Sequence, residues 1–343
     1  MIVLASPLSA KTNPYIDLLY AGMPDFGVTV KAFSVQNLKN RCDVCHIHWP
    51  DLVLSRESLL ASLNQALRLW LMLLWAKLRW RAKVVWTVHN LEPHERSLPR
   101  WWRRLFYRIW FRFVDGCIFM SEASRRAFEQ KYQRSYPHAL VPHGHYCDVY
   151  DKVEAEAGLR ERLGVRADDV VFGHYGQIRD YKNVPHLMRE FTKLEGEHYK
   201  LIVAGRVRVQ DRALQDELGA IVDEDSRIQF IDGFVSDEAM KALYELTDWA
   251  VLPYKDILNS GSALLALSLG CPVLVPNLPT MVELQQQLGA HLVHLIPAAG
   301  LDEGLRACAP EAGVRCERSD LIALEWSCLS GQLKQFYATC IKK

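Results

Sequence analysis

One stretch in the second half of the chain combines residue types that suit the binding of an anion. Gly176 is followed by Arg179 and Lys182. Glycine lets the backbone approach a ligand closely, arginine offers a planar fork of donors, and lysine offers a compact charge. We expect a helix to open in this stretch, and a helix N-terminus favours anions. The stretch therefore predicts a diphosphate site, with two surface cations on an ordinary turn as the alternative.

A small polar loop later in the chain leads into an apolar helix over Ala263–Leu269. The candidate residues of this loop are Tyr254, Lys255, Asn259, Ser260 and Gly261. Backbone N–H groups that lead into a helix can form a cradle for an anion. The same N–H groups would also serve a plain helix cap by a serine. Both interpretations can hold together.

Histidines and carboxylates gather where three expected strands of the first half end. They stand in three short stretches, His46–Asp51, His89–Glu95 and Pro142–Tyr146. Parallel sheets bind ligands at the carboxyl ends of their strands. A transfer to a hydroxyl group needs a general base, and this predicts three candidates: Asp51, His89 and Glu95. We also expect His48, His94 and His145 in the ligand-binding cleft at this edge of the sheet, although a single histidine is more often structural.

A zinc site is the rival interpretation of these histidines and carboxylates. The stretch from His89 to Glu95 is not an H-E-x-x-H motif and is expected on a turn rather than a helix. We therefore expect no metal.

Residues 100–113 are rich in arginine and aromatic residues. Arg103, Arg104, Arg108 and Arg112 recur at helical spacing. Such a helix can lie at the surface of an anionic bilayer, or it can be a core helix whose arginines reach out to solvent. Nucleic acid is not expected, because the second half is acidic and shows no recognition module. Residues 59–80 are apolar but contain Arg68, Lys77 and Arg79, so we do not expect them to span a membrane.

Charge is distributed unevenly along the 343 residues. Residues 1–150 have a balance of +9, and the remaining residues have a balance of −8. This asymmetry suggests that the first half meets an anionic surface, with chance scatter as the alternative. The nine cysteines are odd in number and lie mostly in apolar runs, which is typical of reduced, buried thiols. No signal peptide is recognisable, so we expect a cytoplasmic protein that is peripheral at the inner face of the cell membrane.

Short β-branched runs alternate with helical patterns throughout the chain, which indicates parallel α/β sheets. In the first half we expect strands at Ile2–Ser6, Val28–Phe33, Val44–His48, Val84–His89, Gly116–Met120 and Ala139–Pro142. Helices are expected at Ser55–Arg81 and Ser121–Tyr132, the latter with Ser121 as N-cap but without a full capping box.

The pattern restarts after a charged segment over residues 151–168. Strands are expected at Val170–Tyr175, Lys200–Ala204, Ile228–Ile231, Trp249–Pro253 and Pro272–Val275. The pattern predicts two Rossmann-like domains, 1–150 and 151–320, that face across a cleft, and a C-terminal helix over 321–343 that can cross back to the first domain. No G-x-G-x-x-G or Walker A motif follows the first strand of either half, which argues against a dehydrogenase.

At these motifs the chain resembles bacterial GT-B glycosyltransferases of exopolysaccharide assembly, in particular the xanthan-type GDP-mannose:glycolipid 4-β-mannosyltransferases of glycosyltransferase family 94. The matching stretches run in order over about residues 12–276: Thr12–Tyr15, His46–Asp51, His89–Leu91 with Pro93–Glu95, His143–Tyr146, Ile178–Arg179 with Tyr181–Lys182, Leu252–Lys255, Asn259–Gly261 and Leu264–Leu269.

The resemblance implies an inverting transfer of mannose from GDP-mannose to a polyprenyl-diphosphate-linked oligosaccharide, without a metal. It implies that Arg179 and Lys182 hold the donor diphosphate, and it places Asn13 at the cleft. The related family 4 enzymes carry two glutamates eight positions apart here, but the second position falls near Ala266, which argues against a retaining mechanism. Two alternatives stay open, namely another nucleotide-sugar donor such as a UDP-sugar, and a non-catalytic assembly partner at the membrane.

Overall fold

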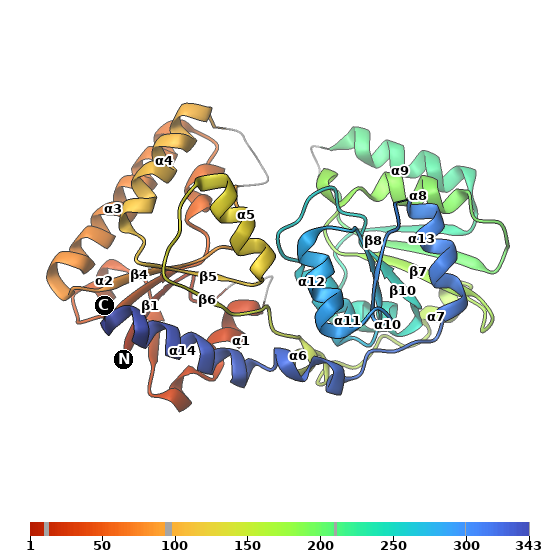
Figure 1. Cartoon of the computed structure of the whole chain (residues 1–343). Coiled ribbons are helices and arrows are strands. Elements are labelled where there is room, and N and C mark those ends of the chain that lie inside the picture. The colour runs from red at the N-terminus through yellow and green to blue at the C-terminus, as the bar shows by residue number, and fades with distance from the viewer. Residues whose placement is uncertain (10–13, 93–97, 209–210, 299, 343) are drawn as a thin grey trace. The chain divides into compact units, whose positions relative to one another are not determined.

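The computed structural model describes residues 1–9, 14–92, 98–208, 211–298 and 300–342. The chain divides into two compact units (Figure 1). Unit 1 comprises Met1–Gly144 and Leu324–Lys343, and unit 2 comprises His145–Ala323. Each unit contains a six-stranded parallel sheet with helices, which is the α/β architecture that the alternating pattern predicts.

The sheet of unit 1 has the order β2-β1-β3-β4-β5-β6, and all its neighbouring strands are parallel. Its strands are β1 (Ile2–Ser6), β2 (Thr29–Ala32), β3 (Val44–Ile47), β4 (Lys83–Thr87), β5 (Gly116–Phe119) and β6 (His138–Leu140). The sequence pattern predicted these six strands correctly, apart from their ends. The strand order reverses between β1 and β3, and in such sheets a ligand crevice lies at the carboxyl ends of the strands beside this point.

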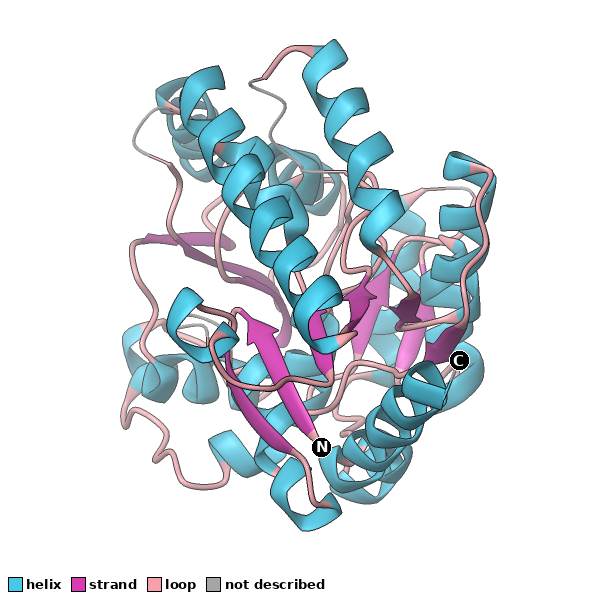
Figure 2. Cartoon of the chain, turned by 90° about the vertical axis from the view of Figure 1, so that its left-hand side faces the viewer, coloured by secondary structure: helices cyan, strands magenta, loops and turns pink. Residues whose placement is uncertain are grey.

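Helices cover both faces of this sheet (Figure 2). They are α1 (Tyr15–Ala21), α2 (Val35–Leu38), α3 (Leu59–Trp80), α4 (Arg100–Phe113), α5 (Glu122–Tyr132) and α14 (Trp326–Lys342), with 3-10 turns η1 (Met23–Phe26) and η2 (Pro50–Ser55). At α5 the sequence prediction was wrong in one respect, because the helix does have a capping box. Ser121 accepts from the Ser124 N–H at 3.0 Å, and Ser124 Oγ accepts from the Ser121 N–H at 3.2 Å. A serine hydroxyl thus replaces the usual glutamate of this motif.

The C-terminal helix α14 belongs to unit 1, although it follows unit 2 in the sequence. Its buried residues recur every three or four positions and pack with α1 against one face of the sheet: Leu329, Leu333, Phe336, Tyr337 and Cys340. A side chain at Gly116 of β5 would bring a Cβ to 2.8 Å from the Phe336 ring. Glycine at this position therefore lets α14 lie directly on the sheet.

The sheet of unit 2 has the order β12-β11-β10-β7-β8-β9 and is also parallel. Its strands are β7 (Val170–Tyr175), β8 (Tyr199–Gly205), β9 (Ile228–Asp232), β10 (Trp249–Val251), β11 (Val273–Val275) and β12 (Val293–Leu295). The sequence pattern predicted the first five and missed β12, a three-residue edge strand. The order reverses between β7 and β10, as in dinucleotide-binding sheets, which marks the ends of these two strands as the ligand side.

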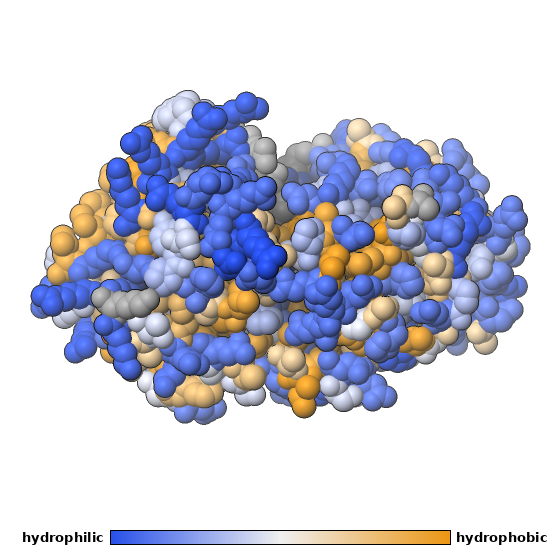
Figure 3. All heavy atoms as spheres, viewed as in Figure 1, coloured by the Kyte–Doolittle hydropathy of each residue, from blue (hydrophilic) through white to orange (hydrophobic). Residues whose placement is uncertain are grey.

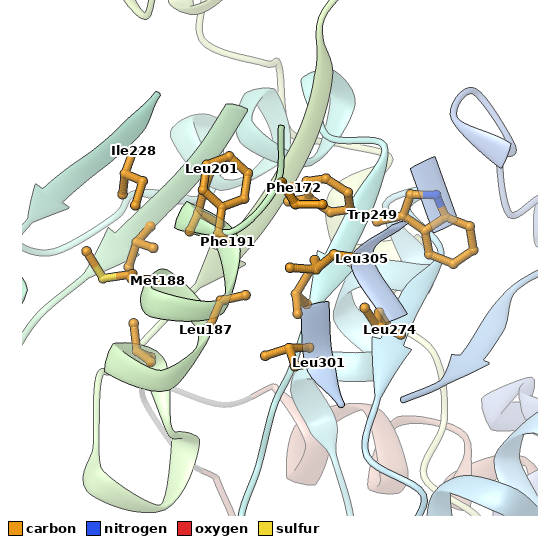
Figure 4. Packing of buried hydrophobic residues seen from close by; sticks show 14 of the residues in the cluster. Phe172, Leu187, Met188, Phe191, Leu201, Ile228, Trp249, Leu274, Leu301 and Leu305 are labelled. Atoms are coloured by element: carbon orange, nitrogen blue, oxygen red, sulfur yellow. The ribbon is translucent and has the colours of Figure 1, made fainter. Parts of the chain in front are cut away.

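The helices of unit 2 enclose its apolar core (Figure 4). They are α6 (Cys147–Tyr150), α7 (Leu159–Arg162), α8 (Val184–Thr192), α9 (Arg212–Glu224), α10 (Asp237–Leu246), α11 (Gly261–Ser268), α12 (Pro279–Leu288) and α13 (Leu301–Cys308), with turns η3 (Asp180–Lys182), η4 (Ala309–Glu311) and η5 (Arg318–Leu324). Phe172 and Trp249 of the two central strands pack with Phe191 of α8 and Leu305 of α13. This packing fixes β7 and β10, whose ends carry the candidate donor loops.

Candidate active site

The loop after β7 comes unusually close to the neighbouring strand. Gly176 has a φ of 109°, a left-handed value that glycine adopts without strain. A Cβ on Gly205, at the end of β8, would lie 1.7 Å from the Gly176 carbonyl oxygen, so only glycine fits there. These two glycines set the path of the residues that follow, including Arg179 and Lys182.

Lys182 is a buried cation. Its residue is 6% exposed, and burial together with the nearby Arg179 charge lowers the pKa of its ammonium group to about 8. Over the ranges that the structure describes, no ion pair joins Lys182 or Arg179 to a carboxylate. Arg179 donates to Gln177 Oε1 at 2.9 Å. Two neighbouring cations without a carboxylate partner are chemically suited to a negatively charged ligand, which is what the sequence predicts here.

The helix expected to open at residues 176–182 begins later, and this part of the prediction was wrong. Residues 180–182 form the short turn η3, and Asn183 has a φ of 58° before α8 starts at Val184. Lys182 therefore precedes the helix rather than forming its first turn.

The polar loop after β10 ends in a capped helix. Ser260 accepts from the Ala263 N–H at 3.1 Å and so caps α11. Tyr254 is buried, hydrogen-bonds with Ser262 and Ser260, and has a pKa raised to about 12 mainly by burial. Lys182 Nζ lies 5.9 Å from the centroid of the Tyr254 ring. This aromatic ring thus links the cation after β7 to the loop after β10.

Backbone and side-chain contacts join the two loops. The Lys255 N–H donates to the Tyr181 carbonyl at 2.9 Å, and Lys255 Nζ lies 2.8 Å from Asp180 Oδ1. Both of these charged side chains are largely exposed, so the ion pair itself stabilises the loops only weakly. Asn259 in the same loop and Gly261, the first residue of α11, are half-buried. All eight candidate donor residues thus lie in the loops after β7 and β10 or at the start of α11, where the strand order of this sheet reverses.

In unit 1, alternation along two neighbouring strands brings histidines together. His46 and His48 point to the same face of the sheet as Val44, and Thr87 and His89 point there from β4, because side chains two apart share a face. This is the face that α1 and α14 cover. Strand geometry therefore gathers residues that the sequence shows as separate motifs.

These side chains form a buried hydrogen-bond network. Tyr20 OH lies 2.7 Å from both His46 Nδ1 and His48 Nε2, and Tyr337 OH lies 2.6 Å from His46 Nδ1. His46 Nε2 contacts Thr87 Oγ1 at 2.7 Å. Hydroxyl groups thus face both ring nitrogens of His46. The network links the C-terminal helix to the end of β3.

The network continues to His89 at the carboxyl end of β4. His48 Nδ1 lies 3.1 Å from His89 Nε2, and the Trp49 ring stacks on His89 with centroids 4.3 Å apart. Burial lowers the pKa of His46 to about 3 and that of His143 to about 4, and it holds the pKa values of His48 and His89 well below 6.5. All four imidazoles are therefore neutral at pH 7.

Asp51 is a carboxylate at this edge of the sheet. It lies in the first turn of η2, just after β3. Burial raises its pKa to about 6, and a hydrogen bond from its own backbone N–H partly opposes this rise. A carboxyl group that titrates near neutral pH suits a general base. Glu95, His94 and Asn13 lie outside the described residues.

Two sequence candidates make contacts within the protein. His145 belongs to unit 2, is fully buried, and accepts from the Cys147 N–H at 3.3 Å. Arg103 was expected on the surface of its helix, which was wrong: its side chain is 14% exposed and lies 3.7 Å from Glu92 Oε2. Arg104, Arg108 and Arg112 are exposed as expected.

Sequence reasoning missed three members of the network, namely Tyr20, Thr87 and Tyr337. Thr87 could have been found from its alternation with His89, but Tyr337 lies 291 residues from its partner His46. In the described residues, no group of three or more histidine, cysteine, aspartate or glutamate side chains is arranged to hold a metal ion.

The two sheets and their loops correspond to known glycosyltransferase domains. Residues 36–149 match the family model Glycosyltransferase Family 4, and residues 169–302 match Glycosyl transferases group 1. The fold is similar to that of sucrose-phosphate synthase from Thermosynechococcus elongatus, with a TM-score of 0.70 and 17% identity over 99% of each chain. It is also similar to Anabaena HepE in complex with UDP and glucose, with a TM-score of 0.63 and 16% identity over 99% of this chain and 97% of that one. The chain is thus a glycosyltransferase of the GT-B fold.

Sequence similarity defines the family more narrowly. The chain is 32% identical over 295 residues to the GDP-mannose:glycolipid 4-β-D-mannosyltransferase of Xanthomonas campestris pv. campestris, which covers 84% of this chain and 76% of the relative. A second protein of that name matches at 31% identity over the same shares. The chain belongs to the family of these GDP-mannose:glycolipid 4-β-D-mannosyltransferases.

Proposed function

We propose that this enzyme transfers mannose from GDP-mannose to a polyprenyl-diphosphate-linked oligosaccharide in exopolysaccharide biosynthesis, with inversion at the anomeric carbon. The names of its relatives support this donor and a glycolipid acceptor. The main support for the donor site is the buried ammonium group of Lys182. It lies beside Arg179, in the loop after β7, where the strand order of unit 2 reverses. A nucleotide diphosphate supplies the anion that these two cations lack.

In the proposed reaction the acceptor hydroxyl oxygen attacks the anomeric carbon of the donor sugar. The bond from this carbon to the diphosphate oxygen breaks, and GDP leaves with the bonding electrons. Lys182, Arg179 and the N–H groups at the start of α11 stabilise the negative charge that develops on the diphosphate. Because protein cations supply this charge, the proposal includes no metal.

The proton of the acceptor hydroxyl passes to a base in unit 1. We favour Asp51 over His89, because burial raises the pKa of Asp51 to about 6 and lowers that of His89 well below 6.5. A base is most effective when its pKa lies near the working pH. His89, held by His48 and Trp49, then serves to orient the acceptor.

A lipid-linked acceptor requires the enzyme to work at a membrane. We propose that it is a cytoplasmic protein that binds the inner face of the cell membrane, with Arg104, Arg108 and Arg112 of α4 attracted to anionic lipid.

Two measurements test the proposal. The first is a thermal-shift titration with GDP and with UDP. GDP should stabilise the protein strongly, by about 2.7 kcal/mol at 100 times the Kd. Purified enzyme, labelled GDP-mannose and a lipid-linked acceptor should then give a labelled β-linked glycolipid. Stabilisation by UDP alone would contradict the proposal that the donor carries a guanine nucleotide. If neither nucleotide raised the Tm, the proposed donor site would be wrong.

A further inference from the structure

Helix α3 carries its large hydrophobic side chains on the outside of unit 1. Leu60 is 77% exposed and Leu78 is 76% exposed. The other exposed members of this outer row are Leu63, Leu67, Leu71, Leu74 and Trp75. The buried face of the same helix is formed largely by small residues, Ser62, Ala66 and Ala76. A surface helix of a domain that meets only water has the opposite distribution.

The outer row is one continuous stripe. Its residues follow each other at steps of mostly three or four, which places them within about 120° of the helix circumference. From Leu60 to Leu78 the stripe is roughly 27 Å long, at 1.5 Å per residue. Figure 3 shows hydrophobic atoms gathered at the edge of unit 1 where α3 lies in Figure 1. An exposed apolar patch of this extent marks an interaction surface.

Helix α4 lies beside α3 and adds cations to the same side of unit 1. The Trp102 indole N–H donates to Ser62 Oγ at 2.7 Å, and the Trp70 and Phe106 rings stack at 5.9 Å. The outward residues of α4 combine two exposed apolar side chains with three arginines: Trp101, Arg104, Leu105, Arg108 and Arg112.

The charge of this surface has a single sign. Neither Leu59–Trp80 nor Arg100–Phe113 contains an aspartate or glutamate, whereas the two segments together contain eight lysines and arginines. Two of these eight, Lys77 and Arg103, pair with Asp115 and Glu92 of other segments. A leucine row flanked by arginines matches the boundary between acyl chains and anionic headgroups. A protein partner would need to be both strongly apolar and strongly acidic on one face.

We propose that α3 and α4 form a docking face that lies in the surface of an anionic lipid bilayer, with the α3 row in the acyl boundary and the α4 arginines at the phosphates. This deepens the proposed membrane location and rests on it. Within the described part of the chain, α3 is the one helix long and apolar enough to cross a bilayer by length and composition. Its buried face packs against unit 1, so it lies along the membrane rather than through it.

Co-sedimentation with vesicles tests this face directly. The full chain should bind vesicles of phosphatidylcholine with 30% phosphatidylglycerol and bind pure phosphatidylcholine much less. L67E/L71E should weaken binding by at least roughly tenfold, since each leucine loses its burial in the acyl region. R104E/R108E should weaken it by about fivefold or more per arginine. F234E, which alters an 80% exposed apolar residue of unit 2, is the matched control and should bind like the wild type.

Two further readouts make the test decisive. Brominated lipid should quench Trp75 fluorescence, and W75F should lose this component of the signal. Unchanged vesicle binding by L67E/L71E, or no binding by the wild type, would overturn the docking face. A wild-type dimer that L67E/L71E converts to monomer, without vesicle binding, would show that a second copy covers the row. Thermal shift with GDP, which depends on unit 2, reports the proposed function separately in each variant.

Discussion

Each of the two units contains its own six-stranded parallel sheet, but the sheets differ in the charge at the edges where ligands are expected. In unit 2 the loops after β7 and β10 surround a buried ammonium group. In unit 1 the corresponding edge holds neutral imidazoles, tyrosine hydroxyls and one carboxyl group with a raised pKa. The first arrangement can hold a departing diphosphate, and the second can accept a proton. In the proposed reaction, the same sheet architecture serves two chemical tasks through different loop residues.

The largest expected effect comes from removing the charge of unit 2. K182M should lower the transfer rate by about 10²–10³-fold, as the loss of one stabilising donor to a developing anion does. GDP should no longer raise the Tm. Because the variant removes a buried charge, the free protein should be no less stable than the wild type, as thermal unfolding can check. Normal turnover of K182M would show that the charge of Lys182 in unit 2 has no role in the transfer.

Removing the carboxyl group of unit 1 should give the next largest effect. D51N should lower kcat by about 10²-fold or more, the usual contribution of a general base, and leave GDP binding unchanged. In the wild type, kcat/KM should fall below pH 6 as Asp51 takes up a proton. An acid limb that persists in D51N, or its absence in the wild type, would assign the proton transfer to another group such as His89.

The pH dependence of GDP binding separates the units further. Lys182 has a pKa of about 8 in the folded protein against its ordinary 10.5, so GDP affinity should fall above pH 8, by up to about tenfold per pH unit. The unfolded chain still binds this proton between pH 8 and 10.5. The contribution of Lys182 to the free energy of unfolding therefore rises over that range. Calorimetric measurements of GDP binding and of thermal unfolding at several pH values should show these two pH dependences in the wild type and not in K182M.

The smallest expected effect concerns the network of unit 1. Y337F removes one hydroxyl group from His46 and should lower the free energy of unfolding by about 1 kcal/mol. Through Tyr20 and His48 it should also reduce transfer severalfold, with a change in kcat rather than in donor KM.

Y136F is the matched control for this variant. The Tyr136 hydroxyl group donates to the Phe111 carbonyl at 2.8 Å, away from the histidines. It should cost similar stability without changing kcat. Equal kcat in the two variants would leave Tyr337 with a purely structural role.

The parallel sheets and the positions of the loops after β7 and β10 could be predicted from the sequence, because β-branched runs and glycine-containing loops are local signals. The β12 edge strand was missed because three residues carry too little periodicity. The late start of α8 depends on the left-handed Asn183, which the sequence does not indicate.

Features that depend on tertiary packing were harder to predict. The alternation of His46 with His48 and of Thr87 with His89 was present in the sequence, but Tyr337 reaches this face only through the return of α14. The direction of the α3 leucines depends on which face of the helix the sheet covers, and the composition of the helix alone does not settle it.

The return of α14 determines the order in which the protein can assemble. Unit 2 is one continuous segment, whereas the core of unit 1 lacks Leu333, Phe336 and Tyr337 until α14 has been synthesised. On the ribosome, unit 2 can therefore complete its core first, while one face of the unit 1 sheet is covered by α1 and still lacks α14. A truncation that removes α14 would consequently damage the part of the protein that is translated earliest.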